Sequence, residues 1–230
     1  TVILDGKGQA QITASDINNG SADNCGLSAL SVTPASFNCS NIGPNSVTLT
    51  VTDVNSNTSS CTATVTVVDS TSPTVVCQNV TVQLNASGNA SITVADIDGG
   101  SSDNCSISSL VASQTSFNCS NVGNNNVTLT APDPAGKTSS CTADVPIEDN
   151  NAPTAICQDI TVALNGSGSA TITASDINNG SSDNCSLAGI SVSPSSFNCS
   201  NVGANTVTLT VTDVNGNSSA CTATVTVEDN

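Results

Sequence analysis

The sequence predicts an all-β protein made of tandem immunoglobulin-like β-sandwich repeats in a linear array. Three observations point there: cysteines recur every 80 residues, apolar and polar residues alternate along β-branched segments, and turn formers follow at intervals of about eight to twelve residues. No segment of useful length has the period of a helix.

The cysteines define the repeat. Boundaries fall at the polar segments VVDSTSPT (67–74) and IEDNNAPT (147–154), each closed by a proline. Repeat one spans residues 1–70 with its beginning cut off, repeat two 71–150 and repeat three 151–230, and we expect the array to continue in both directions. The series spaced by 80 residues are Cys25/Cys105/Cys185, Cys39/Cys119/Cys199, Cys61/Cys141/Cys221 and Cys77/Cys157.

Strands are expected wherever the period is two. VTLTVTD (47–53) places Val47, Leu49 and Val51 on one face and threonines on the other, and CTATVTVVD (61–69) repeats the pattern. LSVT (30–33), VTVQL (80–84) and ASITVAD (90–96) complete the set. Between the last two strands, DVNSN and DVNGN predict hairpin turns, because Asn, Asp and Gly tolerate positive φ.

The charge excludes several functions. Eighteen acidic residues stand against two lysines, a net charge of -16, so nucleic acid and anionic membrane surfaces are excluded as partners. No apolar run is long enough to span a membrane, so we expect no direct membrane contact. Histidine is absent, and no cation lies near a cysteine to activate its thiol. We therefore predict that the chain is not an enzyme.

We expect the cysteines to form disulfides in an oxidising, extracellular environment, since a sandwich with one aromatic residue has a thin core. Zinc is less favoured, because C-x₂-C spacing and histidine are missing. Four cysteines allow three connectivities, and sequence alone does not choose among them. The favoured scheme closes the short 14-residue separation and ties the first strand to the last, with the partner of Cys61 preceding residue 1: Cys25–Cys39, Cys105–Cys119, Cys185–Cys199, Cys77–Cys141 and Cys157–Cys221.

An ordered set of motifs resembles the hyalin repeat (HYR), an immunoglobulin-like extracellular module. SPTVVCQNVTV or APTAICQDITV is followed by SDNC and then by VTLTVTDVNGNSSACTATVTVED. More closely, the repeats look like the variant found in tandem in giant surface proteins of Bacteroidota, including gliding-motility adhesins exported by type IX secretion. Repeat two departs from the pattern with Pro132, Pro134 and Pro146, and we expect Pro132 and Pro146 at a sheet edge or strand end.

We predict a structural stalk or filament segment of a bacterial surface adhesin, because a repeat array gains length by copy number. Its partners would be the neighbouring repeats of the same chain and lateral copies in a fibre. The alternative is that the repeats bind a ligand directly, either a surface polysaccharide or ice.

Calcium is the one cofactor that the sequence suggests, since clustered carboxylates and carboxamides offer the oxygen ligands that Ca²⁺ prefers. Acidic residues at the boundaries could share an ion with the next repeat and so stiffen the joint. The alternative is that Asp and Asn form Asx-turns and need no metal. The candidate ligands are Asp16, Asn18, Asp23, Asn24, Asp69, Asp96, Asp98, Asp103, Asn104, Glu148, Asp149, Asp176, Asn178, Asp183 and Asn184.

Overall fold

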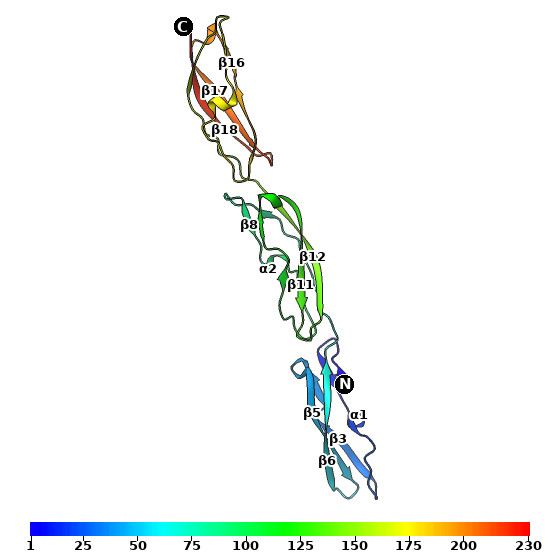
Figure 1. Ribbon diagram of the computed structural model, residues 1–230. Helices are drawn as coiled ribbons and strands as arrows, with labels where there is room; N and C mark the ends of the chain where they lie inside the picture. The colour runs from blue at the N-terminus through cyan, green and yellow to red at the C-terminus, as the bar shows by residue number, and fades with distance from the viewer. The chain divides into compact units, whose positions relative to one another are not determined.

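A computed structural model describes residues 1–230, and it is built almost entirely of strands (Figure 1). The first repeat contains β1 (Val2–Ile3), β2 (Gln9–Gln11), α1 (Ala14–Ile17), β3 (Leu27–Thr33), β4 (Ser36–Asn38), η1 (Cys39–Asn41), β5 (Gly43–Asp53) and β6 (Thr58–Val68). The second contains β7 (Val82–Gln83), β8 (Asn89–Ser91), α2 (Val94–Ile97), β9 (Val111–Ala112), β10 (Ser116–Asn118), η2 (Cys119–Asn121), β11 (Gly123–Pro132) and β12 (Thr138–Glu148). The third contains β13 (Ile160–Ala163), β14 (Ser169–Thr171), α3 (Ala174–Ile177), β15 (Leu187–Ser193), β16 (Ser196–Asn198), η3 (Cys199–Asn201), β17 (Gly203–Asp213) and β18 (Ser218–Glu228).

Each repeat pairs its strands in the same way. A four-stranded sheet has the order β1-β6-β5-β3, and its counterparts are β7-β12-β11-β9 and β13-β18-β17-β15. A second, two-stranded sheet pairs β2 with β4, β8 with β10, and β14 with β16. The first strand runs parallel to the last one, as β1 does beside β6, whereas the other pairs are antiparallel. The predicted all-β sandwich fold in tandem repeats is confirmed.

The chain divides into two compact units, which do not follow the sequence repeats. Unit 1 comprises Thr1–Asn79, Thr93–Ser113 and Val127–Ala143, and unit 2 comprises Val80–Ile92, Gln114–Asn126 and Asp144–Asn230. The repeat boundaries at residues 70 and 150 stay a prediction.

The core lies between the two sheets of a repeat. In repeat three, Val207, Leu209 and Val211 alternate along β17 with fully or nearly fully buried side chains. Phe197 of β16, on the opposite sheet, packs into the same cluster. The expected inward face of VTLTVTD is thus the core face, and the single aromatic residue of each repeat joins the two layers.

One predicted strand is shorter than expected. The strand expected over 90–96 ends at Ser91, and Val94–Ile97 form a single helical turn instead. The reason is a capping box: the N–H and the hydroxyl of Thr93 both donate to Asp96 Oδ2, at 2.6 and 2.8 Å. The same Thr-x-x-Asp pattern starts α1 and α3.

The hairpin turns fall where the DVNSN and DVNGN motifs predict them. Asp213 closes β17, and its Oδ1 accepts hydrogen bonds from the N–H groups of Asn215 and Asn217, at 2.9 and 2.8 Å. Gly216 takes φ +94°, the left-handed conformation that favours glycine. Pro132 is the last residue of β11, as expected, and Pro146 stands two residues before the end of β12.

Two of the expected disulfides are present, and the others are wrong. Cys77–Cys141 and Cys157–Cys221 tie the first strand region to the last strand, with Cα atoms 5.8 and 5.9 Å apart. The second cysteine of each short pair bonds instead to the following repeat, as Cys39–Cys105 and Cys119–Cys185, both with Cα atoms 5.4 Å apart. Cys25, Cys61 and Cys199, which the expected scheme would pair, are free and exposed.

Strand geometry explains why the short pairing fails. Cys25 lies just before β3, whose first residue Leu27 pairs with Asp53 at the end of β5. Cys39 lies in η1, which leads into the start of β5 at Gly43. The two cysteines therefore lie at opposite ends of an eleven-residue strand, about 33 Å apart, whereas a disulfide requires Cα atoms within about 7 Å.

The connectivity can be tested by digesting the unreduced protein with pepsin at acidic pH, which suppresses disulfide exchange, and identifying linked peptides by mass spectrometry. We expect peptides joining Cys39 to Cys105 and Cys119 to Cys185, with alkylation of the three free thiols when these are trapped first. A peptide joining Cys105 to Cys119 would contradict the structure.

Candidate metal centre

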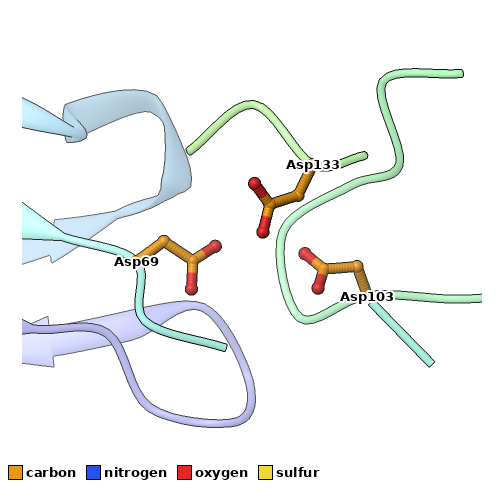
Figure 2. Close-up of side chains that lie close together, drawn as sticks. All are labelled: Asp69, Asp103 and Asp133. Atoms are coloured by element: carbon orange, nitrogen blue, oxygen red, sulfur yellow. The ribbon is translucent and has the colours of Figure 1, made fainter. Parts of the chain in front are cut away.

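Three aspartates from separate segments of unit 1 converge, as Figure 2 shows. Asp69 follows β6 directly, Asp133 follows β11 directly, and Asp103 lies in the loop after α2. One carboxylate oxygen of each lies within 4.8 Å of the others. Asp69 and Asp133 are 1% and 4% exposed, so two of the three carboxylates are removed from solvent.

Each side chain in this cluster is anchored through one side of its polar group. Asp69 Oδ1 accepts from the Thr71 N–H at 3.1 Å, and Asp103 Oδ2 accepts from the Cys105 N–H at 2.9 Å. Asp133 Oδ1 accepts from the Lys137 N–H at 2.8 Å. The Asn104 amide nitrogen donates to Asp69 Oδ1 at 3.2 Å. Local backbone turns thus fix the orientation of all four side chains.

The opposite oxygen of each side chain has no partner. The buried atoms without a hydrogen bond include Asp69 Oδ2, Asp103 Oδ1, Asn104 Oδ1 and Asp133 Oδ2. Buried polar atoms are nearly always hydrogen-bonded, because leaving one unpaired costs about 1–3 kcal/mol and more for a charged group. Four such oxygens at one place therefore require a physical explanation.

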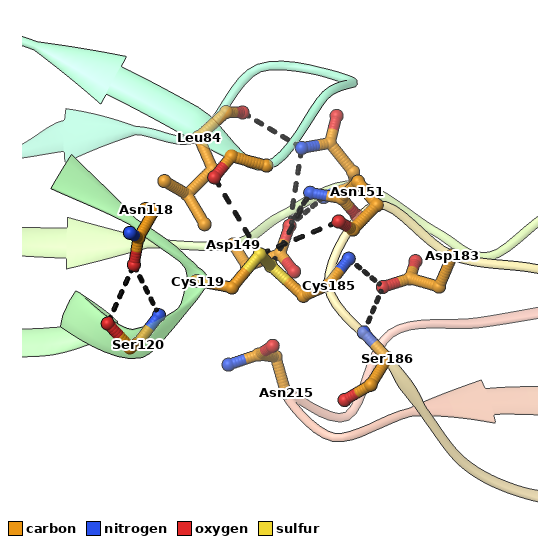
Figure 3. The surroundings of a disulfide bond; sticks show 12 residues. Leu84, Asn118, Cys119, Ser120, Asp149, Asn151, Asp183, Cys185, Ser186 and Asn215 are labelled. Carbon is orange, nitrogen blue, oxygen red and sulfur yellow. Dashed lines mark hydrogen bonds between the residues drawn. A yellow bond between two sulfur atoms is a disulfide. The ribbon is translucent and has the colours of Figure 1, made fainter.

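Unit 2 contains an equivalent cluster, displaced by 80 residues: Asp149, Asp183 and Asp213, whose ligand atoms also lie within 4.8 Å of one another. Figure 3 shows Asp149 and Asp183 beside the Cys119–Cys185 disulfide. Asp149 Oδ2, Asp183 Oδ1 and Asn184 Oδ1 have no partner, whereas Asp213 Oδ2 accepts from the Asn217 amide at 2.8 Å. Burial acts to raise the pKa of Asp213, but the hydrogen bonds from Asn217, Asn215 and Gly216 hold that pKa below its usual value.

The other expected calcium ligands do not join these clusters. Asp16, Asp96 and Asp176 cap the three short helices, and the hydrogen bonds from the preceding threonines lower their pKa values. The remaining candidates make local contacts: Asn18 and Asn178 accept from Ser21 and Ser181, Asp23 from Cys25, Asp98 from Ser101, and Glu148 from Gln83. Asn24 lies beside Asp23 in an exposed loop.

The expected ligands Asp69, Asp103, Asn104, Asp149, Asp183 and Asn184 are therefore the ones that the structure brings together. Sequence reasoning missed Asp133 and Asp213. Their 80-residue recurrence with Asp53 was a visible signal, but the hairpin role of the motif accounted for it fully. In repeat one, both oxygens of Asp53 serve that turn, accepting from the Asn57 N–H and the Asn57 amide.

A glycine permits the close contact beside the first cluster. Gly8 has φ +70°, and a Cβ placed there would lie 2.4 Å from the Cys39 sulfur and 2.7 Å from the Asn104 carbonyl oxygen. Gly88 occupies the same position in unit 2, with φ +71° and 2.7 Å to the Asn184 carbonyl oxygen. Any side chain here would push against the backbone that carries the cluster's asparagine.

Comparison with known proteins agrees with the repeat structure. Residues 68–147 match the HYR domain family model. Among solved structures, the chain is similar to extracellular cadherin domains 1–4 of protocadherin gamma B7 (13% identity, TM-score 0.38, 99% of this chain and 74% of that one). It is also similar to titin domains I67–I69 (10% identity, TM-score 0.39, 96% and 87%) and to domains EC1–3 of mouse PcdhgC3 (12% identity, TM-score 0.34, 81% and 77%). The search of curated proteins gave no significant match.

The matches indicate no catalytic family, and HYR domains are typically binding or structural modules. Four disulfides fit an extracellular location. None of the helices is long and apolar enough to cross a membrane. The chain thus has the character of a structural or adhesion module.

Replacing Gly8 by alanine should destabilise the protein by about 1–3 kcal/mol, because the residue would be strained at positive φ and would clash with Asn104. Urea unfolding followed by circular dichroism measures the effect. Gly6→Ala is the matched control in the same loop, since its Cβ meets nothing within 4 Å and repeat two carries Ala86 there. Equal stability of the two variants would contradict this role for Gly8.

Proposed function

We propose that this chain is a structural segment of an extracellular stalk or filament, a tether whose repeats are linked so that it resists extension. The observation that carries the proposal is the disulfide pattern. Each repeat boundary is crossed by two covalent connections, the main chain and a disulfide, as at Cys39–Cys105 and Cys119–Cys185.

The disulfides overlap along the chain without a gap. Cys77 lies inside the loop closed by Cys39–Cys105, and its partner Cys141 lies outside that loop. The same overlap links Cys141 to the loop of Cys119–Cys185, and that loop to Cys157–Cys221. Complete unfolding of any one repeat therefore releases little length, because disulfides bridge most of its residues.

Each inter-repeat disulfide spans 66 residues, and 14 residues separate Cys105 from Cys119. Together these make one 80-residue period, so a continuous path of one disulfide and a short peptide runs from repeat to repeat. By the chain-entropy estimate, a loop of this size stabilises the folded state by roughly 4 kcal/mol. The disulfides thus supply both cohesion and resistance to stretching.

The parent protein is best explained as a bacterial surface adhesin. This step rests on the resemblance of the motifs to tandem repeats of Bacteroidota gliding-motility adhesins exported by type IX secretion. Neighbouring repeats are the partners that the disulfides imply, and lateral copies in a fibre are a further proposal. No enzymatic role is proposed, since histidine is absent from the chain.

Direct recognition of a polysaccharide has no support from the aromatic residues. Phe37, Phe117 and Phe197 are the only aromatic side chains, and each is 3–4% exposed within a core. None can act as a stacking platform for a sugar ring. Dose-dependent binding to a glycan array would nevertheless favour this alternative over a tether without a ligand.

Single-molecule stretching from residues 1 and 230 tests the tether, with the three free cysteines replaced by serine. The shortest covalent path runs from residue 1 to Cys39, from Cys105 to Cys119, back from Cys185 to Cys157 and on from Cys221, which leaves 38, 14, 28 and 9 residues to extend. We expect the oxidised chain to stop at roughly 320 Å and the reduced chain to reach roughly 800 Å.

The same molecule before and after reduction is its own control. An oxidised chain that extends to the reduced length would overturn the proposal that the disulfides make it a tether.

A further inference from the structure

We propose that each carboxylate cluster binds one Ca²⁺ ion, held by four side chains. The first site consists of Asp69, Asp103, Asn104 and Asp133, and the second of Asp149, Asp183, Asn184 and Asp213. The inference rests on the donor atoms themselves and stands independently of the tether proposal.

The unpartnered oxygens carry this inference. Asp69 is 1% exposed and Asp133 is 4% exposed, yet Oδ2 of each has no hydrogen-bond donor. Figure 2 shows both carboxylates turned toward Asp103. A buried ionised carboxylate without a partner is unfavourable, and three within 4.8 Å also repel one another. A divalent cation would remove both penalties at once.

Asn104 provides an observation that does not depend on the acidic residues. Its amide nitrogen donates to the Asp5 carbonyl at 3.1 Å and to Asp69 Oδ1 at 3.2 Å, which fixes the orientation of the amide group. Its Oδ1 is buried and has no partner. Asn184 repeats this arrangement, donating to Asp149 Oδ1 at 3.1 Å with Oδ1 unpartnered.

The donor set selects the metal. All donors are carboxylate or amide oxygens, which suit hard cations, and Ca²⁺ accepts such mixed sets in flexible geometry with water completing six to eight ligands. Soft metals are disfavoured because histidine is absent and the adjacent Cys105 and Cys185 are in disulfides. Mg²⁺ demands a stricter octahedron and retains its water more strongly.

The two sites differ at one position. Lys137 in repeat two corresponds to Asn217 in repeat three, and only Asn217 donates its side-chain amide to the neighbouring aspartate. Asp133 Oδ2 is therefore free, whereas Asp213 Oδ2 must exchange the Asn217 hydrogen bond for the ion. Asn217 also donates to the Asp149 carbonyl at 2.9 Å, so it can stay in place through that contact.

The ion would join consecutive repeats. In unit 1, Asp69 comes from the end of repeat one, whereas the other three ligands come from two loops of repeat two. The Cys39–Cys105 disulfide begins at the residue next to Asn104, so covalent and ionic links would act at the same place. Binding of Ca²⁺ should consequently raise the melting temperature.

Calorimetric titration of CaCl₂ into the oxidised, EDTA-treated full chain tests the proposal. We expect about two ions per chain and a rise in melting temperature on adding calcium. Asp103→Asn and Asp183→Asn should each reduce the stoichiometry to about one, because asparagine keeps the backbone hydrogen bond but turns an amide nitrogen toward the site.

Asp23→Asn is the matched control. Asp23 occupies the same position of the Asp-Asn-Cys motif and makes the same hydrogen bond to the cysteine N–H, at 2.8 Å, but belongs to no cluster. This variant should bind two ions. Circular dichroism in EDTA checks that each variant folds.

Absence of binding heat together with an unchanged melting temperature in the wild-type chain would refute the inference. Equal loss of binding in Asp23→Asn and Asp103→Asn would also refute it, since that result indicates attraction by the general negative charge.

Discussion

The disulfide that joins the start of one repeat to the preceding repeat is the constraint on which the rest of the structure depends. Cys39 and Cys105 bring the η1 turn of repeat one against the Asp-Asn-Cys loop of repeat two. This contact sets the position of Asn104 and requires glycine at position 8. The turn, the loop and the carboxylate cluster beside them form one assembly around a single covalent bond.

The thin core explains why such a bond is needed. The buried cluster of repeat three consists of small and medium aliphatic side chains and one phenylalanine. Burial of a few such side chains stabilises a small domain only modestly against its conformational entropy. Most of the surface is polar and acidic, so neighbouring repeats gain little from apolar contact. Covalent bonds hold adjacent repeats together where a hydrophobic interface would otherwise do so.

The sequence predicted the fold well because its signals are local. Alternation in VTLTVTD identified the buried face of the longest strands, and the Asp-x-Asn turns identified the hairpins. The one-turn helix at Val94–Ile97 was missed, since four residues show no period, although Thr93 and Asp96 form a recognisable capping box.

The candidate site was predicted only in part, because it depends on contacts between distant residues. Pairing Cys105 with Cys119 minimised sequence separation, but β-strand lengths, which the sequence gives less reliably, decide which cysteines meet. Asp69 and Asp103 were recognised as acidic boundary and loop residues, whereas Asp133 was assigned to its turn alone. An aspartate can serve both purposes, because one oxygen closes the turn while the other remains free.

The staggered disulfides also determine how such a gene can change in length. Because the 66-residue bridge and the 14 residues that follow it make up one 80-residue period, inserting or deleting a whole period leaves every half-cystine with a partner in register. A change of any other length displaces a cysteine from its neighbour and leaves unpaired thiols on both sides. Recombination between repeats can therefore alter copy number without redesign of the junctions, whereas smaller insertions are confined to loops outside the bridged segments.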